Sequence, residues 1–218
     1  MRPLGSRAVW LLLPLAGCAG GPAPGGLTPG ERREIDALLR EGDQARRNGD
    51  LAAAEAAYAA ALEIHPDLAE ARYQRGNLCL QRLRETADLR HGEAAVNEYT
   101  AALRIIPTFA KALYNRAVAY YQLAEYRWAD LYRLAARDLQ RLLESDPRDA
   151  DAHFFLASIY DRHLVGMEQD ALKHYLKYIE LGGRKQEAQK RAMTLARQLE
   201  AASAEKADPA PPAPKPRS

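Results

Sequence analysis

Several features are scarce in this sequence, and each scarcity excludes a class of protein. Among its 218 residues there are only two cysteines, which excludes a framework of several disulfide bonds. The apolar stretch at 8–15 is much shorter than the roughly 20 residues that a membrane-spanning helix needs. The formal net charge of +2 argues against a nucleic-acid binder driven by phosphate contacts. With 7% aromatic and 47% hydrophobic residues, many of them alanine, the composition favours packed helices over a sheet.

Motifs for catalysis are also missing. The sequence has neither a glycine-rich phosphate loop nor a nucleophile elbow, and its serines have no recognisable base partner. No two of the five histidines show the spacing of a metal-binding pair; these are His65, His91, His153, His163 and His174. We therefore predict that the protein is not an enzyme and that it holds no cofactor and no metal.

One stretch, 50–66, is made almost wholly of strong helix formers and ends at a proline. It places Ala54, Tyr58, Ala61 and Leu62 on one face. The same set returns three times, as Ala95, Tyr99, Ala102 and Pro107, then Ala135, Leu139, Leu142 and Pro147, then Ala171, Tyr175 and a stop at Gly182 and Gly183. Ahead of each copy lies another helical stretch with a small residue in its middle, namely Gly42, Gly76, Ala117 and Ala157. The chain is a repeat of helix pairs.

This pattern resembles the tetratricopeptide repeat, whose two helices cross at small residues and carry aromatics beside the crossing. The resemblance covers roughly 35–183 and implies an all-α, right-handed helical-repeat solenoid. Its four units would be 35–68, 69–109, 110–149 and 150–183, within a repeat domain of 31–183. An amphipathic stretch at 184–205 has no partner helix and should cap the open apolar face of the last unit. Beyond it, 206–218 is a Pro/Ala/Lys segment that we expect to be a disordered tail.

The second and third units are longer than the first between their small residues. Gly42 to Ala54 is 12 positions by subtraction, whereas Gly76 to Ala95 is 19. The additions fall near 83–92 and 123–133, and neither contains a proline. Because nothing there breaks a helix, we expect longer helices rather than long loops.

The first residues read as a targeting segment. Two arginines precede the apolar run, and 15–18 reads Leu-Ala-Gly-Cys, which resembles a bacterial lipobox. This resemblance implies a signal peptide at 1–17, lipid attached to Cys18, and a Gly/Pro-rich tether at 18–30. Because Ala19 rather than aspartate follows the cysteine, the resemblance also implies that the protein is anchored to the outer membrane and faces the periplasm. Thr28 is positioned to cap the helix that follows.

Members of the tetratricopeptide-repeat family commonly hold an extended peptide on the concave face lined by the first helix of each unit. Transferred one at a time, the corresponding positions are Asp43 and Arg46 in unit one. In units two to four they include Tyr73, Gln74, Asn77, Lys111, Tyr114, Asn115, Phe154 and Arg162. Amides and a lysine are suited to a peptide backbone or a carboxylate. Leu39 and Asp43 stand where chaperone-binding members place a lysine and an asparagine, so a carboxylate clamp of that type is incomplete.

A possible second surface lies in the third unit, where Trp128 and Tyr132 fall in the added segment. These residue types often anchor interfaces, although the two side chains could equally pack against the longer second unit. The sequence thus predicts a lipid-anchored scaffold that binds an envelope protein or peptide in its groove and no nucleic acid. Alternatives are a pilotin-like assembly factor for a pilus or secretion system, an adaptor for envelope enzymes, or a periplasmic ligand-binding component partnered with a transporter. The last would need an enclosed apolar cavity.

Replacing Cys18 by serine tests the lipid anchor. Each buried methylene of an acyl chain contributes about 0.8 kcal/mol to membrane binding, so several chains anchor a protein stably and their loss should release it. We expect the C18S variant to move from the membrane to the soluble fraction in cell fractionation. A variant that still sediments with membranes would contradict the lipoprotein prediction.

Overall fold

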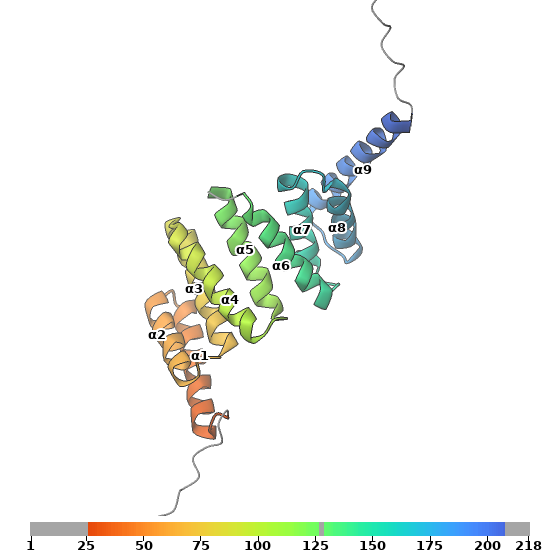
Figure 1. Cartoon of the computed structure of the whole chain (residues 1–218). Coiled ribbons are helices and arrows are strands. Elements are labelled where there is room, and N and C mark those ends of the chain that lie inside the picture. Colours follow the sequence, from red (N-terminus) through yellow and green to blue (C-terminus); the bar gives the residue numbers. More distant parts are fainter. Residues whose placement is uncertain (1–25, 127–128, 208–218) are drawn as a thin grey trace, which may run out of the picture.

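The structure is a computed structural model that describes residues 26–126 and 129–207. Within these residues the chain forms nine helices and no strand, which confirms the predicted all-α fold (Figure 1). The helices are α1 (Pro29–Arg47), α2 (Leu51–Ile64), α3 (Ala69–Thr86), α4 (Leu89–Ile105), α5 (Ala110–Tyr126), α6 (Leu131–Ser145), α7 (Ala150–His163), α8 (Glu168–Glu180) and α9 (Gln186–Ala207).

The helices pack in sequence order as four pairs. Contacts join α1 to α2, α3 to α4, α5 to α6 and α7 to α8, and each second helix also contacts the first helix of the next pair. The pairs form an elongated array with α1 and α2 at one end and α8 and α9 at the other (Figure 1). Helix α9 packs on α8 through Ala188, Ala192 and Leu195, all of which are buried. It therefore covers the apolar face of the last pair, as a terminal cap must in stacked repeats.

The helix ends follow from local sequence. Thr28 forms a capping box with Glu31, and Asp50 and Asp149 cap α2 and α7 through their side chains.

The residues added near 83–92 lengthen both helices on one side of the crossing, as the sequence predicts. By subtraction, α3 runs 10 positions past Gly76 whereas α1 runs 5 past Gly42, and α4 begins 6 positions before Ala95 whereas α2 begins 3 before Ala54. The turn between α3 and α4 is tight, and Ala87 caps α3 in the left-handed conformation (φ 54°) that usually takes glycine.

The two helices of the first and second units approach closely because each first helix has a glycine at the crossing. A Cβ atom on Gly42 would lie 2.5 Å from Cε1 of Tyr58, and one on Gly76 would lie 2.5 Å from Cε1 of Tyr99. Both tyrosines have no exposed surface. The ring of each tyrosine therefore occupies the space that any larger residue at the crossing would need.

The buried tyrosine hydroxyls also need partners, and the residue after the small one supplies them. Tyr58 donates to Asp43 Oδ1 at 2.6 Å, and Tyr99 donates to Asn77 Oδ1 at 2.8 Å. In the fourth unit the hydroxyl of Tyr175 lies 3.5 Å from Ser158 Oγ. The third unit has Leu139 in place of the tyrosine, and there the residue after the small Ala117 is the apolar Val118. The two positions thus change from polar to apolar together.

Buried ion pairs join the later helices to one another. Asp138 on α6 is 3% exposed and accepts from Arg116 Nε and Nη2 on α5, both at 2.7 Å. Arg116 also donates to Thr100 Oγ1 on α4 at 2.9 Å, so one guanidinium joins three helices. The guanidinium of Arg191 on α9 holds the Asp161 carboxylate on α7 in the same way, with Nε at 2.6 Å. Each bidentate pair fixes the register of its helices.

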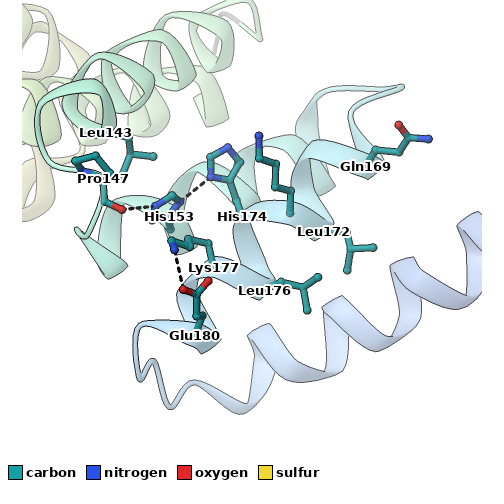
Figure 2. Close-up of a pocket in the computed structure, with 10 residues that line it drawn as sticks. Leu143, Pro147, His153, Gln169, Leu172, His174, Leu176, Lys177 and Glu180 are labelled. Carbon is teal, nitrogen blue, oxygen red and sulfur yellow. Dashed lines mark hydrogen bonds and ion pairs between the residues drawn. The ribbon is translucent and has the colours of Figure 1, made fainter.

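Two histidines form a hydrogen bond between α7 and α8 (Figure 2). Their Nδ1 atoms are 2.7 Å apart, and the ring centroids are 5.0 Å apart, close to the largest value that this distance allows. His153 Nε2 lies 3.1 Å from the carbonyl oxygen of Pro147, which can only accept. His153 is therefore protonated on Nε2, and His174 donates its Nδ1 proton to His153. Burial is the main cause that lowers the pKa of His174 to about 4, and the neighbouring His153 and Lys173 lower it further.

Replacing Gly76 by alanine tests the helix crossing. The new Cβ would overlap the Tyr99 ring, so we expect a loss of about 1–3 kcal/mol in the free energy of unfolding. Gly30, in the first turn of α1, is a matched control because a Cβ there meets nothing closer than 3.8 Å. We expect G30A to be neutral or slightly stabilising. Equal melting temperatures for G76A and the original protein would contradict the proposed crossing.

Replacing His174 by glutamine tests the histidine pair. Because the folded-state pKa is below that of the unfolded chain, the unfolded state binds more protons between about pH 6.5 and pH 4. The stability that this group contributes is fully present above that window and is lost as the pH falls through it. We expect the original protein to lose about 2 kcal/mol more than H174Q across the window, allowing for partial solvent screening. Parallel stability curves, measured by chemical denaturation, would refute this assignment.

Candidate partner-binding groove

Six of the residues that the resemblance assigns to a binding groove lie together in the structure. Helices α3 and α5, the first helices of units two and three, contact each other directly. Two adjoining hollows of about 310 and 530 Å³ lie along them and share Tyr73, Lys111 and Asn115. The smaller hollow adds Tyr114, and the larger adds Gln74 and Asn77. We call these two hollows together the A-helix groove.

A network of amides fixes the floor of the groove. Asn77 Oδ1 accepts from Tyr99 OH and from Asn115 Nδ2, both at 2.8 Å, and Asn77 Nδ2 donates to Gln74 Oε1 at 3.0 Å. Asn115 Nδ2 also lies 3.3 Å from the hydroxyl of Tyr73. Asn77 is therefore part of the helix crossing as well as of the groove. The orientation of Asn115 follows from these bonds, which use its amide donors and leave its carbonyl oxygen for a peptide N–H.

Aromatic rings form the walls and are held by their neighbours. The Tyr73 ring lies 5.1 Å from the Phe109 ring and 6.0 Å from the Tyr99 ring, centroid to centroid. Tyr114 lies 5.8 Å from Phe155 in a tilted arrangement. Rings packed in this way offer flat apolar surface at little entropic cost on binding. The groove can thus hold an extended chain between rigid walls.

Charged residues also line the groove. Arg46 on α1, a position that the resemblance assigns to the groove, lines the larger hollow. The structure adds three residues that were not predicted: Arg84 on α3 in the larger hollow, and Asp149 and Asp151 at the start of α7 in the smaller one. Arg84 comes from the residues that lengthen α3, outside the repeat positions. Asp149 is identifiable in the sequence only as a helix cap. Their proximity to Lys111 depends on the superhelical path, which no local pattern reveals.

The two predicted site residues of unit four lie outside the A-helix groove. Lys185 Nζ lies 3.9 Å from the centroid of the Phe154 ring, which also packs on Tyr178 at 5.2 Å. Arg162 forms an ion pair with Glu187 at the start of α9. The segment that leads into α9, and α9 itself, therefore engage this part of the first-helix face.

Only Tyr132 of the possible second surface lies within the described residues, and its side chain is buried. Trp128 lies outside the described residues. Tyr132 is only 7% exposed, because its ring stacks on His163 at 3.8 Å and meets the edge of Tyr121 at 5.3 Å. The prediction of an exposed anchor at Tyr132 is therefore wrong. The aromatic partners of Tyr132 lie on α5 and α7.

A third hollow, of about 550 Å³, lies between α6 and α8 (Figure 2). Leu143, Pro147, Leu172 and Leu176 give it mainly apolar walls, and the histidine pair lies at its edge. The sequence spacing gave no sign that His153 and His174 would meet. Their Nδ1 atoms point at each other and are joined by one hydrogen bond, which leaves no space for a metal ion between them. Over residues 26–126 and 129–207 no group of three or more metal-ligating side chains occurs.

Several predicted features fall outside the part of the chain that the structure describes. These are the signal peptide at 1–17, the lipid site at Cys18, most of the tether at 18–30, and most of the tail at 206–218. Among the described residues, none of the helices has the length and apolar character to cross a bilayer.

Comparison with known proteins identifies the repeats. A family model described as "Tetratricopeptide repeat" matches residues 39–89 and 129–185. No protein with a curated description matches the chain. A solved structure of YrrB, described as a TPR protein with an unusual peptide-binding site, has a TM-score of 0.62 at 22% identity, covering 78% of this chain and 81% of that one.

Two further solved structures share the fold. The MamA protein matches with a TM-score of 0.56 at 22% identity, over 84% of this chain and all of the other. The O-GlcNAc transferase of Thermobaculum terrenum matches with a TM-score of 0.54 at 23% identity, over 71% of this chain but only 27% of the enzyme. At these identities the likeness shows the fold alone. Residues 39–89 and 129–185 thus match the tetratricopeptide repeat, and the helical array that contains them has the fold of a tetratricopeptide-repeat solenoid.

Proposed function

We propose that this protein is a non-enzymatic scaffold that holds an extended segment of a partner protein in the A-helix groove, at the bacterial cell envelope. The observation that carries the proposal is the meeting of Tyr73, Asn77, Lys111 and Asn115 in two adjoining hollows on α3 and α5. These side chains combine flat rings, a fixed amide network and a charged group. Such a set suits the backbone and side chains of an extended peptide.

The comparisons support a peptide ligand. The YrrB structure is described as having a peptide-binding site, and another structure with the same fold is the first TPR of Spaghetti (RPAP3) bound to the HSP90 peptide SRMEEVD. The Spaghetti domain matches with a TM-score of 0.50 at 19% identity, over 58% of this chain and 93% of that domain. A partner segment is therefore the ligand class that we assign to the groove.

The envelope location rests on the first 30 residues. The lipobox-like 15–18 and the Gly/Pro-rich segment after it fit a protein tethered by lipid on Cys18 to the outer membrane and facing the periplasm. A pilotin-like role in pilus or secretion assembly would be one form of this function. A ligand-binding component of a transporter would need an enclosed chamber, whereas the A-helix groove and the hollow between α6 and α8 both open to solvent.

Photo-crosslinking in cells tests the groove directly. Tyr114, in the groove, and Tyr126, 62% exposed at the end of the same helix, are each replaced by benzoylphenylalanine in the full-length protein. We expect a crosslinked partner from position 114 and none from position 126, because only the first contacts the groove. The adduct should weaken at least several-fold when Lys111 is also changed to alanine.

Lys173→Ala provides the matched control, since this lysine is exposed on α8, next to the hollow between α6 and α8. It should leave the adduct unchanged. A partner that crosslinks from position 126 alone, or an adduct lost with K173A and kept with K111A, would place the binding surface elsewhere and overturn the proposal.

A further inference from the structure

One end of the A-helix groove carries uncompensated positive charge. Arg46, Arg84 and Lys111 come from three different helices and line one hollow. Among the described residues, none of their nitrogens has a carboxylate oxygen within 4.0 Å, and Arg46 Nε is buried without a hydrogen-bond partner. The Asp43 carboxylate instead accepts the hydroxyl of Tyr58. We call Arg46 and Arg84 the basic pole; Lys111 lines both hollows and belongs to neither end.

The lack of partners at the basic pole is not general to the arginines of this chain. On α3 itself, Arg75 and Arg82 pair with Glu98 and Glu55 at 3.1 and 2.7 Å. Those arginines stabilise the fold by joining neighbouring helices. Arg84 has no such role, although it lies on the same helix, so its charge is available to a ligand.

The adjoining hollow carries negative charge. Asp149 caps α7 by accepting from Ala152 N through Oδ1, and its second oxygen has no protein donor within the described residues. The Asp151 carboxylate is 71% exposed, and Lys185 Nζ approaches it only to 3.7 Å. Burial, Asp151 and Asp149 together raise the pKa of the Tyr114 hydroxyl, so both carboxylates act on this wall of the groove. We call Asp149 and Asp151 the acidic pole.

From this charge arrangement we infer that the partner segment is bipolar: it places an acidic side chain at the basic pole and a lysine or arginine at the acidic pole. The inference rests on the proposed function and specifies the ligand of the same groove. Arg84 is in the last turn of α3, whereas Asp149 precedes the first turn of α7, so the poles lie at opposite ends of the first helices as well as on different helices. The two charges of the ligand therefore lie near opposite ends of the bound segment.

The contacts between the poles fix the segment without reading its sequence. The free carbonyl oxygen of Asn115 accepts a backbone N–H, and Tyr73 and Tyr114 pack against whatever side chains lie between the charges. Because opposite charges lie at the two ends, reversing the chain would bring like charges together at both. The poles therefore set the direction of binding.

Peptide selection on the purified full-length protein in detergent tests this inference. Random 12-residue peptides displayed on phage are enriched, and the affinities of synthetic copies are measured by fluorescence anisotropy. We expect enriched peptides to carry an acidic and a basic residue in one fixed order along the chain. The R46Q/R84Q and D149N/D151N variants should each bind them at least tenfold more weakly. Asparagine keeps the cap at position 149, so the second variant removes charge and not the helix end.

Arg104→Gln is the control, because Arg104 is exposed on α4 and lies outside the groove. The affinity of this variant for the enriched peptides should equal that of the original protein. Enriched peptides that lose binding in a Y114A variant yet lack the charge pair would overturn the bipolar inference and leave the proposed function intact. If no enriched peptide depends on Tyr114, both would be overturned.

Discussion

The contact of a tyrosine ring with the backbone of a glycine sets the spacing of the helices in the first two units of this protein. Gly42 and Gly76 leave room for Tyr58 and Tyr99, and the hydroxyl of each ring is hydrogen-bonded to the residue after the glycine. In the last two units alanine takes the place of the glycine, at 117 and 157, and stacking of the four pairs generates the array. One of those hydroxyl acceptors, Asn77, is also in the floor of the groove. The packing of the second unit therefore orients a binding residue directly.

The repeat itself could be predicted from the sequence because small and large residues recur at fixed helical positions. The longer α3 and α4 could be predicted because no proline or glycine interrupts the added residues before Gly92. Family positions also identified Tyr73, Lys111 and Asn115, which the structure brings together. Each of these inferences uses information within one helix pair.

The remaining features depend on contacts between units, which have no signal in a local pattern. Arg84 and Asp149 come from different units and line the groove only because of the path of the array. The pairing of His153 with His174 depends similarly on how α8 lies against α7. Tyr132 has the composition of an interface anchor but is buried by its neighbours, which a residue type alone does not reveal.

These contacts divide the first-helix face into two parts. Over units one to three it is open, with amides, rings and uncompensated charges. Over unit four it is engaged by Lys185 and Glu187, which precede or begin α9. The capping helix thus protects the last apolar face and also limits the groove to the earlier units. A partner would meet a site with a defined end, consistent with an extended segment of limited length.

The most direct measurement is nuclear magnetic resonance of the side-chain amides while a groove-selected peptide is added. Asn77 and Asn115 lie in the groove floor, whereas Gln169 lines the hollow between α6 and α8. Binding in the A-helix groove predicts shifts in the Asn77 and Asn115 amide resonances with Gln169 unchanged. Shifts at Gln169 with the Asn77 and Asn115 resonances unchanged would contradict binding in the A-helix groove. They would place the ligand in the hollow between α6 and α8.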